Sequence, residues 1–372
     1  MKIQMYTQKL VDLKGSDLHL KVGIRPVIRV NGELVYLEGE TITKEYMEEL
    51  IAPLMNPKRE KELKEELTTD FAYAVPGLAR FRVNLSYQRG SYMMVMRMIS
   101  NDSPDIEDLN LPPSLKDIVD VKNGLILVTG ATGSGKSTTV AAMINFINSH
   151  YTKNIITIED PIEYLFKDKT CIVAQKEIGS DVVSFESALK YVLRQDPDVI
   201  FLGELRDRET MEAAIKASET GHLVISTLHT INAYQTISRI IDFFPEERHK
   251  QIRYQLSENI RGIISQRLVP TVDNKRRAAN EVMINSPTIR ELILTSEGTA
   301  EIPRYIADGK DSNGMQTFDQ SLIELYNAGI ITYETALKFA TVKKDIELLR
   351  RGVSFSSMAD MFNEMVEENQ KI

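Results

Sequence analysis

A glycine-rich segment at residues 130–137 constrains the fold of this chain more than any other sequence feature. It reads Gly-Ala-Thr-Gly-Ser-Gly-Lys-Ser and matches G-x-x-x-x-G-K-[ST], the pattern of a phosphate-binding loop. The pattern requires a buried strand before it and a helix after it, and the apolar run 125–128 and residues 138–147 fit those two elements. The alternative, a glycine-rich turn without a ligand, is disfavoured by the complete motif in this context. We therefore expect a mainly parallel α/β sheet with a phosphate site after one strand.

The loop predicts how a nucleotide would be held. Glycines let backbone N–H groups face the β-phosphate, and the N-terminus of the following helix adds a favourable dipole. Lys136 would bridge the β- and γ-phosphates, and the Ser137 hydroxyl would hold Mg²⁺. The residues expected to contact ATP are Gly130, Ala131, Thr132, Gly133, Ser134, Gly135, Lys136, Ser137 and Thr138.

Acidic residues follow two further buried strands. The apolar strand 198–202 leads to Glu204, where a Walker B acid is expected, and residues 158–163 contain Glu159, Asp160 and Glu163. The carboxyl ends of parallel strands face the ligand crevice. Glu204 could therefore hold Mg²⁺, partly through water, or orient the attacking water, and a carboxylate of the second cluster could position or deprotonate that water. Acids at strand ends are also common helix caps. Spacing alone does not separate the roles of Glu163 and Glu204.

Two histidines bracket one predicted strand. His222 precedes the apolar segment 223–226 and His229 follows it. A neutral imidazole can donate to phosphate or pair with a carboxylate, so we expect a γ-phosphate sensor or a contact between subunits. The alternative for His222 is that it only satisfies a helix end.

Two arginines lie outside this part of the chain. In residues 80–85 apolar and polar residues alternate, which predicts a strand with Arg80 and Arg82 on one face. ATPases with this loop often need a guanidinium to stabilise charge on the transferred phosphoryl group. The alternative is a pair of exposed arginines that only aid solubility.

The chain divides near residue 100. Residues 1–99 read as a small α+β domain, which includes a hairpin at 27–36 with an Asn-Gly turn. Residues 100–113 are acidic and polar and are interpreted as a linker. Residues 114–372 alternate apolar strands, at 125–129, 155–158, 199–202 and 223–226, with helical segments, and become mostly helical past 235.

Composition narrows the function classes. Among 372 residues, 45 Lys and Arg face 53 Asp and Glu, and the net charge of −8 disfavours non-specific nucleic-acid binding. One cysteine excludes a disulfide framework and a cysteine-rich zinc module. We find no signal-peptide pattern and no apolar run long enough to span a bilayer. Direct membrane insertion is therefore not expected.

These motifs together resemble the secretion-superfamily ATPases that drive type IV pili and type II secretion. One cysteine cannot supply the tetracysteine zinc element of the extension and secretion members, so the resemblance is greatest to the pilus-retraction, PilT-type branch. The matching segments are residues 16–20, 80–84, 130–138, 158–164, 198–207, 221–230 and 315–322. Residues 288–295 share the apolar frame of a helix motif of the retraction branch but lack its final Arg-Glu pair, which keeps an accessory retraction paralogue as an alternative.

The resemblance implies a PAS-like N-terminal domain, a RecA-like ATPase domain and a ring of six identical subunits. It makes Glu163 the catalytic glutamate, Glu204 the Walker B acid, His222 and His229 His-box contacts, and Arg80 and Arg82 arginine fingers. It further implies a cytoplasmic, Mg²⁺-dependent motor for pilus retraction and twitching motility. Such a motor would attach to the inner membrane through a pilus platform protein. A nucleotide-gated scaffold without significant turnover, and a nucleic-acid translocase, are the alternatives from other classes.

Overall fold

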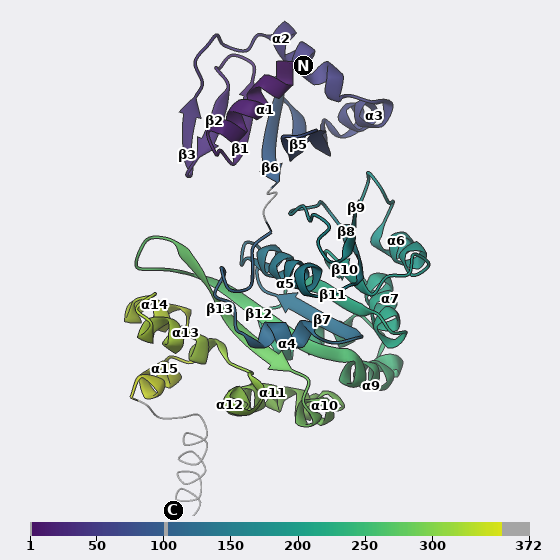
Figure 1. The fold of residues 1–372 in the computed structure, drawn as a ribbon, viewed down its shortest axis with the longest axis vertical. Helices are drawn as coiled ribbons and strands as arrows, with labels where there is room; N and C mark the ends of the chain where they lie inside the picture. The colour runs from purple at the N-terminus through teal and green to yellow at the C-terminus, as the bar shows by residue number, and fades with distance from the viewer. Residues whose placement is uncertain (1, 100–102, 352–372) are drawn as a thin grey trace, which may run out of the picture. The chain divides into compact units, whose positions relative to one another are not determined.

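A computed structural model describes residues 2–99 and 103–351, and its contacts divide the chain into two compact units (Figure 1). Unit 1 contains residues 1–102 together with residues 160–166 and 177–181. Unit 2 contains the remainder of the chain. From Ser354 onward, Met358, Met361, Phe362 and Met365 recur near helical spacing, which predicts an amphipathic terminal helix; this segment lies outside the described residues.

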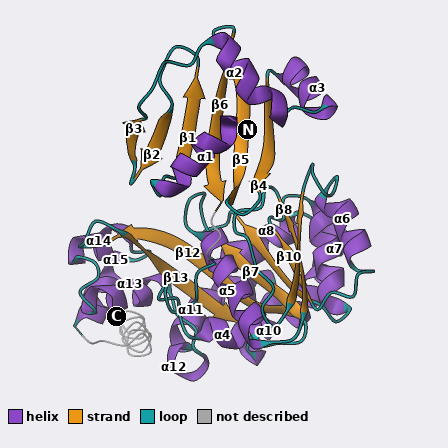
Figure 2. Ribbon diagram, turned by 45° about the horizontal axis from the view of Figure 1, so that its top comes forward, coloured by secondary structure: helices purple, strands orange, loops and turns teal. Residues whose placement is uncertain are grey.

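Unit 1 is an antiparallel sheet with helices packed on one of its faces (Figure 2). The strand order is β3-β2-β1-β6-β5-β4. The strands are β1 (Asp17–Lys21), β2 (Val27–Val30), β3 (Glu33–Tyr36), β4 (Thr68–Val75), β5 (Ala79–Gln88) and β6 (Ser91–Ile99). The helices are α1 (Lys2–Asp12), α2 (Lys44–Ile51), the 3₁₀ turn η1 (Ala52–Leu54) and α3 (Pro57–Glu66).

Local sequence explains two of these elements. Asn31 and Gly32 both have positive φ, which the tight turn of the β2–β3 hairpin requires, and the predicted hairpin is confirmed. Along β5 the side chains of Phe81, Val83 and Leu85 are fully buried in the core. The predicted alternation is thus confirmed, and it places Arg80 and Arg82 on the opposite face of the sheet.

Unit 2 is built on a seven-stranded sheet with the order β13-β12-β7-β11-β10-β8-β9. The strands are β7 (Gly124–Thr129), β8 (Asn154–Glu159), β9 (Ile172–Glu177), β10 (Val199–Leu202), β11 (Leu223–Leu228), β12 (Ile260–Pro270) and β13 (Arg276–Ile284). Strands β8, β10, β11, β7 and β12 run parallel, and β13 is antiparallel to β12. The four predicted buried strands are confirmed as β7, β8, β10 and β11.

Helices surround this sheet. They are α4 (Ser114–Val119), α5 (Lys136–His150), α6 (Phe185–Val192), α7 (Arg208–Glu219), α8 (Ala233–Asp242), the 3₁₀ turn η2 (Glu246–Arg248), α9 (His249–Asn259), α10 (Pro287–Ile293), α11 (Ser296–Asp308), α12 (Lys310–Asn313), α13 (Phe318–Asn327), α14 (Tyr333–Phe339) and α15 (Lys343–Arg350). Every residue of β7 and β11 is buried, as expected of strands covered on both faces.

Strands β12 and β13 of unit 2 were not predicted from the sequence. Past residue 235 the chain is mostly helical, but β12 and β13 add a hairpin to the sheet there. The apolar residues of β12 do not alternate with polar ones, because a strand inside a sheet covered on both faces is apolar on both sides. Periodicity therefore gave no signal for a strand.

Residues 103–113 belong to unit 2, and the first of them contact its helix α5. Ile106 and Leu111 are buried, and the Asn145 side chain on α5 donates hydrogen bonds to the Ser103 and Pro104 carbonyls and to Asp105 Oδ1. The part of the predicted linker that the structure describes is thus held by side-chain and apolar contacts.

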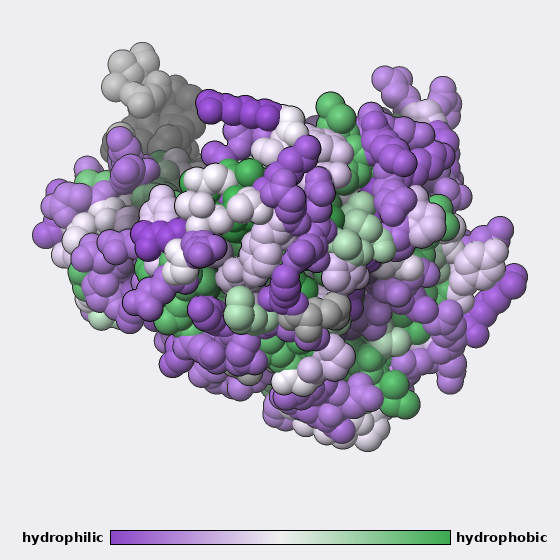
Figure 3. Space-filling model, turned by 90° about the horizontal axis from the view of Figure 1, so that it is seen from above, coloured by the Kyte–Doolittle hydropathy of each residue, from purple (hydrophilic) through white to green (hydrophobic). Residues whose placement is uncertain are grey.

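On the face shown in Figure 3, hydrophilic residues predominate and hydrophobic residues are scattered among them. Within residues 2–99 and 103–351, no helix combines the length and the apolar composition that crossing a bilayer demands.

Candidate nucleotide site

The glycine-rich loop joins β7 to α5 at the carboxyl edge of the parallel sheet. Gly130, Gly133 and Gly135 have φ values of +147°, +77° and +91°, which residues other than glycine rarely adopt. A Cβ atom at Gly130 would lie 2.5 Å from both the Gln266 carbonyl oxygen and Ser134 Oγ. The loop can keep this path only with glycine at position 130.

Lys136, the first residue of α5, is buried and its ammonium group turns back over the loop. Its Nζ donates to the Gly130 carbonyl oxygen at 2.8 Å and to the Ala131 carbonyl oxygen at 3.2 Å. Ser134 is also buried, and its Oγ has no hydrogen-bond partner among the described residues. A cation, an unsatisfied hydroxyl and a helix N-terminus are thus gathered at one loop, which is the donor set that a phosphate requires.

Glu204 lies two residues beyond β10, and each of its two carboxylate oxygens contacts another side chain. Its Oε2 accepts a hydrogen bond from Arg206 Nε at 2.9 Å, and its Oε1 lies 3.2 Å from His229 Nε2. The other ring nitrogen of His229, Nδ1, is 3.5 Å from Lys136 Nζ. The histidine therefore connects the Walker B position to the lysine of the glycine-rich loop.

Parallel pairing of the strands brings these residues together. β7 pairs with β11 from Gly124 opposite Leu223 to Thr129 opposite Leu228, and β11 pairs with β10. The strands therefore end side by side, so the glycine-rich loop, Glu204 and His229 emerge at the same edge.

His222 lies at the other end of β11. Its Nδ1 is 3.1 Å from the Ala217 carbonyl oxygen near the end of α7, and 3.3 Å from Thr220 Oγ1. These contacts match the alternative interpretation, in which the ring satisfies a helix end. Its role as a His-box contact stays a prediction.

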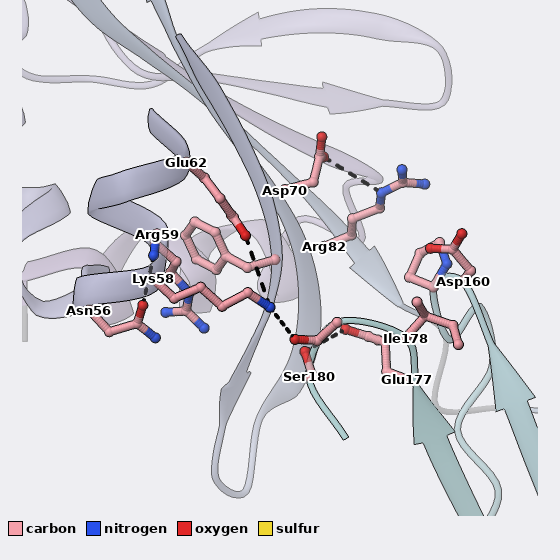
Figure 4. Close-up of a pocket in the computed structure, with 13 residues that line it drawn as sticks. Asn56, Lys58, Arg59, Glu62, Asp70, Arg82, Asp160, Glu177, Ile178 and Ser180 are labelled. Atoms are coloured by element: carbon pink, nitrogen blue, oxygen red, sulfur yellow. Dashed lines mark hydrogen bonds and ion pairs between the residues drawn. The ribbon is translucent and has the colours of Figure 1, made fainter. Parts of the chain in front are cut away.

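The other predicted residues belong to unit 1. Arg80 Nη2 lies 3.2 Å from Glu177 Oε2, and Arg82 Nε lies 3.9 Å from Asp70 Oδ1. Glu163 is exposed on the loop 160–166. A cavity of about 390 Å³ in this unit is lined by Arg82 and Asp70 together with Asp160 and Glu177 (Figure 4).

Two polar residues near these groups were missed by sequence reasoning. Glu177, at the end of β9, is the buried partner of Arg80. Gln266 on β12 accepts a hydrogen bond from Thr139 Oγ1 on α5 at 2.8 Å and so supports the helix that begins at the loop. Neither belongs to a motif, and the polar stretch 175–177 around Glu177 gives no periodic signal.

The residues predicted to contact Mg²⁺ belong to the glycine-rich loop and to the segment that follows β10. Within the described residues, no group of three or more His, Cys, Asp or Glu side chains is placed to hold a metal ion. Ser137 and Glu204, the residues predicted to hold Mg²⁺, follow β7 and β10 and lie at the same edge of the sheet.

The model of the type II/IV secretion system protein family matches residues 74–322, which is more than half of the chain. The chain belongs to this family. It is 43% identical over 350 residues to the type IV pilus ATPase PilU of Pseudomonas aeruginosa, covering 94% of this chain and 91% of that protein. It is also 43% identical over 331 residues to the pilus retraction ATPase PilT of the same organism, covering 89% and 96%.

A solved structure agrees with these relatives. The crystal structure of the pilus retraction motor PilT with bound ADP matches 93% of this chain and 98% of that chain, with a TM-score of 0.85 and 42% identity. The resemblance seen in the sequence is confirmed, as is the fold class of a RecA-like P-loop domain with a smaller N-terminal domain. The prediction that the chain is an ATP hydrolase of this family is confirmed as well.

Proposed function

We propose that this chain is a Mg²⁺-dependent ATPase motor that powers retraction of type IV pili and twitching motility. The observation that carries the proposal is the chain of contacts from Lys136 through His229 to Glu204 beside the glycine-rich loop. It connects a phosphate-binding cation to an acid suited to a metal or a water molecule. Relatives named as pilus ATPases at 43% identity support the same function.

The predicted site residues have different roles in ATP binding and hydrolysis. Backbone N–H groups of residues 130–138 and Lys136 bind the phosphates, and Ser137 with Glu204, partly through water, holds Mg²⁺. When bound, Mg²⁺ neutralises phosphate charge during transfer. Glu163 orients and deprotonates the attacking water.

The two arginines of β5 act as fingers that stabilise the developing charge on the transferred group. His222 and His229 are the His-box contacts. The structural support is strongest for His229, whose ring lies between Glu204 and Lys136.

The assembly follows from the same resemblance. We propose a homohexamer in which hydrolysis drives a rotation between the N-terminal domain, residues 1–99, and the ATPase domain, residues 114–372, of each subunit about the linker predicted at residues 100–113. The ring acts at the cytoplasmic side of the inner membrane, where it contacts the platform protein of the pilus. No nucleic-acid partner and no direct membrane insertion are part of the proposal.

An accessory retraction ATPase like PilU is the second candidate. Two observations favour keeping it. Identity is 43% to PilU and 43% to PilT, and the segment 288–295, most of which lies in α10, lacks the final Arg-Glu pair of the retraction branch. Restoring pilus retraction in cells that lack only PilT, or only PilU, separates the two roles.

The test compares ATP binding with turnover in Glu204→Gln and Glu163→Gln, with Glu246→Gln on an exposed turn as the control. Both variants of the site should bind ATP normally and lose turnover by about 10²–10³-fold, because the amide at position 163 cannot act as a base and the amide at position 204 carries no charge to hold Mg²⁺. Turnover per chain of the unaltered protein should rise with concentration, since neighbouring subunits complete the sites. Normal turnover in both variants would refute the carboxylate roles, and ATP binding without turnover at any concentration would favour a scaffold.

A further inference from the structure

One buried carboxylate in unit 1 joins two groups that the proposed function needs. Glu177 Oε2 accepts from Arg80 Nη2 at 3.2 Å and from the backbone N–H of Ile162 at 3.3 Å. Ile162 directly precedes Glu163 in the loop 160–166. A single oxygen atom therefore contacts both the predicted arginine finger and the backbone beside the predicted catalytic glutamate.

The surroundings hold this carboxylate in place. Ser180 Oγ lies 3.4 Å from Glu177 Oε1, and Glu177 N donates to Asp181 Oδ2 at 2.8 Å. Lys58 on α3 donates a hydrogen bond to the Gly179 carbonyl oxygen and so ties the same turn to a helix of unit 1. Both carboxylate oxygens are thus near donors, and the backbone on either side is fixed.

The contact between Glu177 and Arg80 is largely shielded from solvent. The side chains are 5% and 24% exposed. A carboxylate removed from water is tolerated only when its partners compensate for the lost hydration, so loss of one partner leaves the other uncompensated. Arg80 Nε is also buried and lacks a hydrogen-bond partner among the described residues, so the guanidinium depends on its Nη2 contact for orientation.

The second arginine of the same strand provides a contrast. Arg82 Nε lies 3.9 Å from Asp70 Oδ1, and these side chains are 48% and 53% exposed. Solvent screens such a pair, and its contribution is small. Figure 4 shows Arg82 and Asp70 projecting from their strands beside the cavity, which Asp160 and Glu177, the last residue of β9, also line.

We propose that Glu177 is a positioning residue for ATP hydrolysis: it fixes Arg80 and the loop that carries Glu163 in one geometry. Glu177 itself does not contact the nucleotide. It acts through the arginine and through the Ile162 backbone. The inference rests on the proposed function, and it adds a residue that lies in none of the sequence motifs.

The test is a double-mutant cycle on the full-length chain with ATP. Glu177→Gln removes the charge but retains an oxygen that can accept from Ile162, and Arg80→Lys retains the charge without the planar donors. We expect each to lower kcat by about 10- to 100-fold through misplacement of reacting groups, with KM for ATP within about twofold. Because both changes break the same contact, the double variant should be no slower than the slower single variant.

The matched control is Asp70→Asn, which removes the exposed carboxylate beside Arg82 and should leave kcat unchanged. An unchanged kcat in Glu177→Gln would overturn the proposal, and so would kcat losses that multiply in the double variant. If Glu177→Gln does not fold, as judged by its melting temperature, Glu177→Asp is judged by the same criteria. ATP binding without turnover in the unaltered chain would refute the proposed function itself, and full turnover in Glu163→Gln would refute the role of Glu163. An inactive Glu163→Gln beside a normal Glu177→Gln would refute only the inference.

Discussion

Glu204 and His229 follow neighbouring parallel strands, and Glu204 Oε1 lies 3.2 Å from His229 Nε2. Lysine can only donate hydrogen bonds, so the 3.5 Å contact between Lys136 Nζ and Nδ1 requires Nδ1 to accept. The ring proton then lies on Nε2, where it can be donated to Glu204. One imidazole ring thereby contacts both the lysine of the loop and the predicted Walker B acid.

Replacing His229 by glutamine should slow hydrolysis more than it weakens ATP binding. The amide is shorter and cannot reach Lys136 and Glu204 together, so we expect kcat to fall by about 10- to 100-fold while KM changes little. Steady-state ATPase assays provide the measurement. His150→Gln, at the exposed end of α5, is the control. A variant with normal kcat would show that the bridge has no part in turnover.

Lys136→Ala should abolish tight nucleotide binding. The ammonium group is the buried cation of the loop, and its charge-assisted hydrogen bonds to phosphate contribute about 1.5–3 kcal/mol each, so affinity should fall by at least tenfold. Titration with a fluorescent ATP analogue measures the dissociation constant. Lys122→Ala, an exposed lysine before β7, should bind as the unaltered chain does. Equal affinity in the two variants would contradict the assignment of the loop.

Gly130→Ala tests the close approach of the loop to β12. The new Cβ would lie 2.5 Å from the Gln266 carbonyl oxygen, and φ at +147° is unfavourable for alanine. We expect a loss of stability of about 1–3 kcal/mol together with weaker ATP binding. Gly32→Ala, in a turn with open space around the glycine, should leave ATP binding intact. Thermal melting with and without ATP separates the two effects.

A buried glutamate on β13 should make stability fall as pH rises. Burial raises the pKa of Glu281 to about 7, although the hydrogen bond from Ala233 N and the charge of Arg267 oppose that rise. Between the ordinary glutamate pKa near 4.3 and about 7, the folded chain holds a proton that the unfolded chain has lost. The stabilising contribution of the protonated group is therefore complete below the lower value and disappears as pH passes the upper one.

Glu281→Gln should remove this dependence. The amide can still accept from Ala233 N but carries no charge, so the variant should be more stable than the unaltered chain at pH 8, by on the order of 1 kcal/mol. The difference should shrink at pH 5. Denaturation curves at the two pH values provide the test, with Glu246→Gln as the exposed control. A constant difference between the two pH values would contradict the raised pKa.

Local sequence determined much of this protein. The phosphate loop, the four buried parallel strands, the hairpin at 27–36 and the strand carrying Arg80 and Arg82 follow from residue types and periodicity. They could be predicted because a turn, a helix start or a two-residue alternation depends on neighbours in the chain. The family resemblance then supplied roles that spacing left open, such as the distinction between Glu163 and Glu204.

Only the tertiary structure decided which side chains meet. Glu177 and Arg80 are 97 positions apart, and Lys136 and His229 are 93 apart, so no local pattern relates the members of either pair. The hairpin of β12 and β13 was hidden for a similar reason, since burial on both faces removes the alternation that identifies a strand. Contacts between distant segments depend on strand order and packing, which a linear pattern of residue types does not encode.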